Sequence, residues 1–336
     1  MEHADRTSHA TKNVRDILEQ AFEKKPSEQM LVIFDTHSPL AQILTEAYRQ
    51  AVPDGLFLDF ENITPDEIRA QINQLSPGDL VILVQSSNFR LNEFRFRIEL
   101  FARNLKTIEH AHLNRISGEQ VDCYINALTY NPTYYRPLGH ALKKRIDEAT
   151  RTVVRCDGTE LIYDGPLETA KLNIGDYAGM KNIGGLFPIG EVFTESKDFK
   201  TVNGTAKIFA FASEDHLVRM YEPFTVTITN SILTAQNAPP EFDAILKKIS
   251  EEEEILVREL GFGLNPAMGK DHFIADINSF ERQKGLHLSL GAKHAIYAKQ
   301  GYSRRGGRYH VDVFVDVERV TINDTPIFQD GNYTVL

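Results

Sequence analysis

The sequence has 336 residues, of which 42% are hydrophobic and 25% are charged. This is the composition of an ordinary globular protein, and it excludes disordered, collagen-like and fibrous proteins. The chain carries 37 Lys and Arg residues against 47 Asp and Glu residues, which gives a formal net charge of −10 and disfavours binding to nucleic acid. We therefore expect a folded protein with room for two hydrophobic cores and without a nucleic-acid partner.

The cysteines and the N-terminal residues bear on the cellular compartment. Two cysteines, Cys123 and Cys156, are too few for a disulfide framework, and their spacing is not that of a redox pair. The first residues are polar, without the apolar segment of a secretion signal, and no stretch reaches the ~18 apolar residues of a membrane span. These features predict a cytoplasmic protein without a membrane partner.

The N-terminal part alternates short apolar runs with amphipathic stretches. The expected strands and helices follow one another at 30–35, 38–51, 55–60, 64–75, 79–84 and 92–105. Continuous apolar strands that are each followed by a helix are typical of a parallel sheet covered on both faces. We predict a doubly wound α/β domain over 1–150. It lacks the glycine-rich motifs G-x-G-x-x-G and G-x-x-x-x-G-K-[ST], so nothing indicates a bound dinucleotide or nucleoside triphosphate.

The C-terminal part has the pattern of strands and tight turns. Alternating β-prone runs are separated by Asp-Gly and Asn-Asp pairs, which favour hairpin turns. One amphipathic stretch, 239–260, predicts a helix whose acidic run at 251–254 faces solvent. We therefore expect a β-rich α+β domain over 151–336.

Histidines are concentrated near the C-terminus. In a strand, the segment around His287 places His287 and Ser289 on one face and three leucines on the other, so that the polar pair lies on the less apolar side. The segment around His310 likewise places His310 and Asp312 on one face. An H-x-D pair sets an imidazole beside a carboxylate, as metal ligation requires. The alternative is a polar strand that faces solvent.

Two glutamates upstream extend this pattern. Glu191 lies in the glycine- and proline-containing segment 182–195, and Glu259 lies two residues before Gly261, which is expected to end the helix. Each glutamate alone is typical of a solvent-exposed acid. Together with the histidine strands they form an oxygen and nitrogen ligand set without thiolates, which suits Zn, Co, Mn or Fe(II). The candidate metal ligands are Glu191, Glu259, His287, His310 and Asp312.

Four segments carry a resemblance to a known family. NIGGLFPIGEVFTE, RELGFGLNP, GLHLSLG and YHVDVF resemble, in order and spacing, the motifs of the aminopeptidase T family of metallopeptidases. The resemblance spans 182–316. It implies an α/β N-terminal half, a metal-binding C-terminal half, a homodimer, and removal of N-terminal residues from peptides with a pair of metal ions.

Carried over position by position, the resemblance assigns the same five residues as metal ligands. In a hydrolase, we expect Glu191 or Glu259 to be the catalytic base or the carboxylate that two metal ions share. Family members place a tyrosine seven residues after the first histidine, where this chain has His294. A histidine cannot act as a phenol, so we assign His294 to oxyanion stabilisation or to the coordination shell. The acidic segment that precedes the first histidine in the family is matched loosely by 280–282.

A more distant branch of the same superfamily resembles 2,5-dihydroxypyridine dioxygenase, an enzyme that uses one Fe(II) to open an aromatic ring. Two histidines and one aspartate form the facial triad that such an enzyme needs, and His287, His310 and Asp312 would provide it. Three functions therefore stay open: a hydrolase of peptides, a dioxygenase of a small molecule, and a metal-free binding protein.

Three arginines lie close together in the sequence near the C-terminus: Arg304, Arg305 and Arg308. They could bind the carboxylate of a substrate or belong to a solvated loop.

Overall fold

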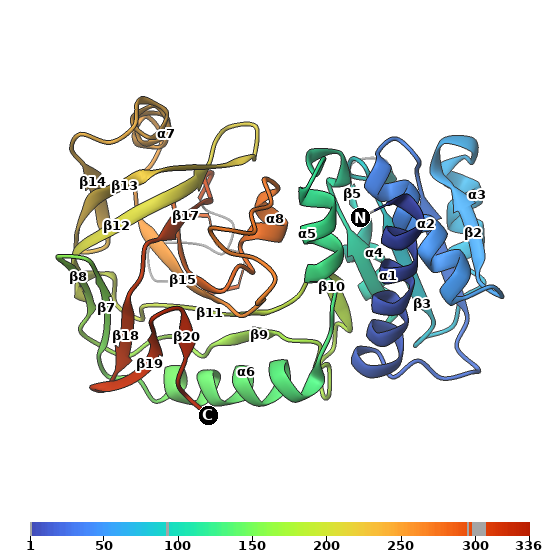
Figure 1. Cartoon of the computed structure of the whole chain (residues 1–336), viewed down its shortest axis with the longest axis horizontal. Coiled ribbons are helices and arrows are strands. Elements are labelled where there is room, and N and C mark those ends of the chain that lie inside the picture. The colour runs from blue at the N-terminus through green and yellow to red at the C-terminus, as the bar shows by residue number, and fades with distance from the viewer. Residues whose placement is uncertain (1, 92–93, 294–295, 298–306) are drawn as a thin grey trace. The chain divides into compact units, whose positions relative to one another are not determined.

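The computed structural model describes residues 2–91, 94–293, 296–297 and 307–336. The chain forms two compact units, each assembled from three segments of the sequence (Figure 1). The first unit comprises Met1–Thr133, Gly175–Ile189 and Lys270–Ser279, and the second comprises Tyr134–Ile174, Gly190–Gly269 and Phe280–Leu336. The expected boundary at residue 150 lies inside the second unit.

A parallel sheet forms the centre of the first unit. Its strands lie in the order β10-β6-β3-β1-β2, and every pairing is parallel. β1 and β3 are buried along their whole length, as their continuous apolar sequences predict. The bounds are β1 (Met30–Phe34), β2 (Leu56–Asp59), β3 (Leu80–Val84), β6 (Lys106–His110) and β10 (Gly184–Leu186). The prediction of a doubly wound parallel sheet is therefore confirmed.

Helices cover both faces of this sheet. One hydrophobic cluster joins the Leu31 and Val81 face of the sheet to α3 and α4, while α2 contacts β1 and β3 from outside that cluster. α1 packs on α2 and buries Ala10 and Val14, although its mostly polar sequence did not indicate a helix. The helices are α1 (His3–Asp16), α2 (Pro39–Ala51), α3 (Pro65–Ile72), α4 (Phe96–Ala102) and α5 (Gln120–Ala127).

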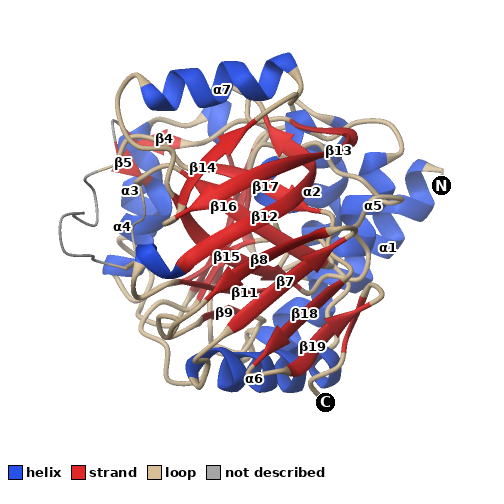
Figure 2. Cartoon of the chain, turned by 90° about the vertical axis from the view of Figure 1, so that its left-hand side faces the viewer, coloured by secondary structure: helices blue, strands red, loops and turns tan. Residues whose placement is uncertain are grey.

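A large antiparallel sheet forms the second unit, as the β-rich pattern predicted. Its principal strand order is β20-β19-β18-β7-β8-β12-β17-β16-β15-β11-β9, with β13 and β14 paired beyond β12. Figure 2 shows α7 (Pro240–Ser250) and α6 (Pro132–Asp147) at opposite ends of this sheet. The strands are β7 (Thr152–Cys156), β8 (Thr159–Tyr163), β9 (Lys171–Asn173), β11 (Glu191–Glu195), β12 (Val202–Ala212), β13 (Val218–Thr229), β14 (Ile232–Ala235), β15 (Val257–Gly263), β16 (Gly285–Leu290), β17 (Val311–Val315), β18 (Arg319–Ile322), β19 (Thr325–Gln329) and β20 (Asn332–Tyr333).

Two local predictions were wrong in the second unit. The helix expected over 239–260 ends at Ser250, and Glu259 lies on β15, where Gly261 is a strand residue and not a helix cap. The strand wins because β11 and β16 supply backbone partners on both sides of β15. His287 and Ser289 contact Glu259 and Asp312, so they lie on the less apolar face of β16 that the alternation predicted, although all six residues of this strand are buried.

Among the described residues, no helix combines the length and the apolar character that crossing a membrane would require.

Candidate metal centre

The candidate ligands lie on four neighbouring strands. Glu191 begins β11, Glu259 lies on β15, His287 on β16 and Asp312 on β17, while His310 directly precedes β17. These strands follow one another in the order β17-β16-β15-β11. Side chains on one face of adjacent strands are about 5 Å apart, so this order brings the carboxylates around the histidine of the central strand.

His287 is the centre of this group. Its Nε2 lies 3.2 Å from Oε1 of Glu259 and 3.5 Å from Oε1 of Glu191. One ligand atom each from Glu259, His287 and Asp312 lie within 4.8 Å of one another. The exposed fractions are 4% for Glu191, 7% for Glu259, 0% for His287 and 5% for Asp312. The structure thus brings four of the five candidate ligands together in the interior of the second unit.

His310 lies at the edge of the cluster. Its Nε2 is 3.3 Å from Oδ1 of Asp312, which also accepts a hydrogen bond of 2.6 Å from Oγ of Ser289. Its Nδ1 is 3.1 Å from the carbonyl oxygen of Lys293, which can only accept, so Nδ1 carries a proton. The His310 side chain is 34% exposed. It therefore connects the buried acids to the surface.

A further acid, Glu281, joins the group on the side of Glu191. Ligand atoms of Glu191, Glu281 and His287 lie within 4.8 Å of one another. Arg282 pairs with Glu281 and also lies 3.4 Å from Glu191. The sequence contained a weak signal for this residue, the loosely matched acidic segment 280–282, but it did not identify Glu281 as a ligand.

The pKa shifts follow from burial and from the density of charge. Burial raises the pKa of Glu191, against the lowering effect of Arg282 and His287. Burial lowers the pKa of His287, but the surrounding carboxylates raise it more. For Asp312, burial raises the pKa and His310 lowers it below its ordinary value. Asp312 in turn outweighs the burial of His310 and raises its pKa to about 9.

This charge balance fits a divalent cation. Buried carboxylates are costly unless cations or hydrogen bonds compensate them. Here four acids, Glu191, Glu259, Glu281 and Asp312, lie around the His287 imidazole, and the Arg282 guanidinium compensates part of their charge. Carboxylate oxygens and imidazole nitrogens are the ligands that Zn, Mn and Co accept. The donor set and its excess of negative charge therefore have the chemistry of a metal site.

A glycine on the neighbouring strand makes room for the central histidine. Gly261 of β15 is paired with His287 of β16. A Cβ atom at position 261 would lie 2.0 Å from Cε1 of the His287 ring, a distance no side chain can adopt. The glycine that was interpreted as a helix cap is therefore required by the packing of the imidazole.

The other residues named from the sequence have different outcomes. His294, Arg304 and Arg305 are outside the described residues, so the role assigned to His294 stays a prediction. Arg308 is exposed and pairs with Glu252. Cys123 is buried in the first unit, where burial raises the pKa of its thiol to about 11, in keeping with a packing residue.

Solved structures similar to this chain include two enzymes. 2,5-Dihydroxypyridine dioxygenase from Pseudomonas putida KT2440 superposes with a TM-score of 0.64 at 12% identity, over 99% of this chain and 98% of that one. AmpT from Thermus thermophilus superposes with a TM-score of 0.58 at 13% identity, over 97% of this chain and 99% of that one. No protein-family model matches the chain, and no curated protein matches its sequence. The expected resemblance is confirmed as a shared fold.

Proposed function

We propose that the chain is a metal-dependent hydrolase that removes N-terminal residues from peptides, and that the buried cluster around His287 holds its metal. The observation that carries this proposal is the number of carboxylates. Four carboxylates each place an oxygen within 4.8 Å of a nitrogen of His287: those of Glu191, Glu259, Glu281 and Asp312. Such an oxygen-rich set supports water activation by Zn, Co or Mn.

The two groups of ligand atoms share His287, and they indicate which residues would hold each of two metal ions. Glu259, His287 and Asp312 would hold one ion, with His310 beside Asp312 completing its shell, and Glu191 with Glu281 would supply oxygen ligands for a second ion. When bound, a divalent cation lowers the pKa of a water molecule and polarises a carbonyl group.

The chain's own residues then handle the proton. Glu191 or Glu259 would accept a proton from the attacking water and return it to the leaving amine, since both are buried carboxylates of this ligand group. Ser289 donates to Oδ1 of Asp312 and so orients this carboxylate. His294 would stabilise the developing oxyanion or complete the coordination shell.

A second candidate is an Fe(II) ring-cleaving dioxygenase. Its support is the adjacency of His310 and Asp312, 3.3 Å apart, beside His287, which together offer two imidazoles and one carboxylate. Against it stand three further carboxylates beside these ligands, those of Glu191, Glu259 and Glu281, which a triad of two histidines and one carboxylate does not require. We therefore rank hydrolysis first.

The deciding experiment measures metal content and activity on the same preparation. Protein purified without chelators is analysed for metals, then assayed with a panel of fluorogenic aminoacyl substrates and for oxygen uptake with dihydroxylated aromatic compounds. The hydrolase predicts a pair of Zn, Co or Mn ions and release of the fluorophore. One Fe with oxygen uptake would establish the dioxygenase, and no metal with no activity would favour a binding protein.

Ligand variants test the site itself. His287→Ala and Asp312→Ala should each abolish stoichiometric metal while the first unit stays folded, as judged by circular dichroism. His140→Ala and Asp243→Ala replace exposed residues of α6 and α7 and are matched controls that should retain metal. Full metal content in either ligand variant would remove that residue from the site. We also propose that the protein is cytoplasmic and forms a homodimer. Light scattering measures the molecular mass and so tests the homodimer.

A further inference from the structure

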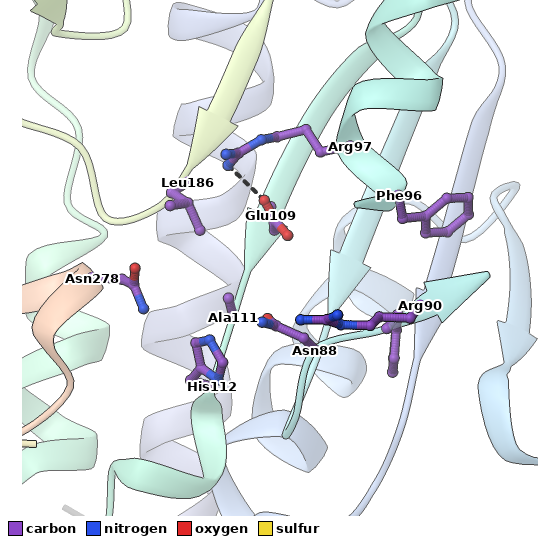
Figure 3. A pocket seen from close by; sticks show the side chains of 10 residues that line it. Asn88, Arg90, Phe96, Arg97, Glu109, Ala111, His112, Leu186 and Asn278 are labelled. Carbon is purple, nitrogen blue, oxygen red and sulfur yellow. Dashed lines mark ion pairs between the residues drawn. The ribbon is translucent and has the colours of Figure 1, made fainter. Parts of the chain in front are cut away.

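A second group of polar side chains lies in the first unit, at the carboxyl ends of β3 and β6 (Figure 3). It lines a cavity of about 150 Å³. The chain after β3 supplies Asn88 and Arg90, the chain after β6 supplies His112, and Asn278 adds a further amide. Open parallel α/β sheets bind ligands beyond the carboxyl ends of their strands. The cavity therefore lies where this class of fold places a binding site.

One of these residues has an unusual backbone conformation. His112 has a φ of 57°, in the left-handed region that residues other than glycine seldom adopt. The residues after it are tied to the end of β3, because the Leu113 N–H donates to the Gln85 carbonyl at 3.0 Å. Strained residues that the surroundings hold in place cluster at ligand sites. Figure 3 shows the His112 ring beside the space that Asn88 and Asn278 also line.

The charges of the cavity favour an anion. Arg97 pairs with Glu109 at 2.6 Å, and Glu109 also accepts from Nε2 of Gln85 at 3.1 Å, so this carboxylate is compensated within the wall (Figure 3). Arg90 is exposed and lines the cavity. Its charge leaves the lining net positive, in a chain whose formal net charge is −10. A local cationic cavity on an acidic protein attracts a negatively charged ligand.

We propose that this cavity binds a small organic oxyanion, a carboxylate or a phosphate, and that the Arg90 guanidinium contacts its oxygen atoms. The planar guanidinium fork matches both kinds of oxyanion, and the amides of Asn88 and Asn278 can donate further hydrogen bonds. Phe96 and Leu186 provide an apolar wall for the carbon skeleton. The volume is below the about 300 Å³ at which sites for drug-sized ligands begin, so the ligand is small. This site is separate from the proposed hydrolytic centre and does not depend on it.

Calorimetric titration of the full chain tests the proposal. Inorganic phosphate and succinate are titrated separately at constant ionic strength, with chloride as the background anion. We expect saturable binding of at least one of them, and the one that binds identifies the source of the oxyanion. Arg90→Gln should weaken that Kd by about tenfold or more, because a charge-assisted hydrogen bond is lost. Arg15→Gln, at an exposed position of α1, should leave it unchanged.

A second variant separates binding in the cavity from attraction to the surface. Ala111 lines the cavity and is 6% exposed. Ala111→Leu fills the space while every charge stays in place, so it should abolish binding, with folding checked by thermal unfolding. The proposal is overturned if neither anion binds, or if the anion that binds the wild type binds Arg90→Gln with the same Kd. Binding at the metal centre would give this second result.

Discussion

His110 lies in the core of the first unit, and its hydrogen bonds define which nitrogen carries the proton. The Tyr124 hydroxyl donates to the Phe187 carbonyl at 3.0 Å, so its oxygen accepts from Nδ1 of His110 at 2.9 Å. Nε2 then accepts from the Tyr48 hydroxyl at 2.8 Å. Burial lowers the pKa of His110 to about 3, so the ring is neutral at physiological pH. This histidine stabilises the fold, whereas His287 belongs to the candidate site.

The depressed pKa of His110 predicts a pH-dependent stability. The unfolded chain, with a histidine pKa of about 6.5, binds the proton more readily than the folded chain. The stabilisation is therefore complete above about pH 6.5 and is lost as the pH falls toward 3. Between about pH 6 and 4, wild type should lose up to about 1.4 kcal/mol per pH unit more than His110→Gln. Urea unfolding across this range measures the difference, and parallel curves would contradict it.

Gly261 gives a prediction about the metal centre. Gly261→Ala would force the buried His287 ring to move, since the new Cβ would lie 2.0 Å from its Cε1. We expect loss of metal and a destabilisation of about 1–3 kcal/mol, as for other overpacked cores. The control is Gly269→Ala, where a Cβ meets no atom within 4 Å. Metal analysis and urea unfolding are carried out on both variants. A Gly261→Ala protein that retains full metal content would contradict the prediction.

Among the elements, α3 shows how much a local sequence can specify. Oγ1 of Thr64 accepts from the Glu67 N–H at 3.3 Å, and Oε2 of Glu67 accepts from the Thr64 N–H at 2.9 Å. This reciprocal pair satisfies two donors at the helix start. Both residues of this cap lie within four consecutive positions, 64–67, so the sequence alone can predict where the helix begins.

Removing the cap should cost stability. Thr64→Ala leaves the Glu67 N–H without its side-chain acceptor and should destabilise the protein by about 1 kcal/mol. Thr64→Ser keeps a hydroxyl oxygen and should retain most of that stability. Both are measured by urea unfolding. Equal stability of the alanine and serine variants would show that the cap contributes nothing.

The strand β15 shows the opposite case. Its sequence, Val257–Gly263, continues an amphipathic stretch and was expected to end a helix. In the fold it pairs with β11 on one side and β16 on the other. Pairing with distant segments outweighs the local preference for a helix, because a strand between two others satisfies its backbone groups on both edges.

At the scale of the whole molecule, the segments alternate between the two units. Residues 175–189 leave the second unit to add β10 to the parallel sheet beside β6, and 270–279 also belong to the first unit. A single boundary near 150 was the simplest expectation from a change in sequence pattern. The contacts of these short segments are made with residues far away in the chain, which local patterns do not report.

Metal removal should act on the stability of the chain. A ligand that binds only the folded state stabilises it by about 2.7 kcal/mol at a hundredfold excess over its Kd. Chelation should therefore lower the unfolding temperature of wild type, and added Mn or Zn should restore it. Asp312→Ala should show neither change. Thermal scans with and without chelator measure this, and an unfolding temperature insensitive to metal in wild type would contradict a bound ion.

By itself, the sequence determined the parallel sheet of the first unit, the β-rich second unit and the set of side chains able to bind a metal. These depend on hydrophobic periodicity and side-chain chemistry, which neighbouring residues display. Only the tertiary structure decided that Glu259 lies on a strand, that Glu281 joins the acids, and that Gly261 admits the His287 ring. Those outcomes depend on which strands pair and in which register, and this is decided by burial and backbone pairing between residues distant in the sequence.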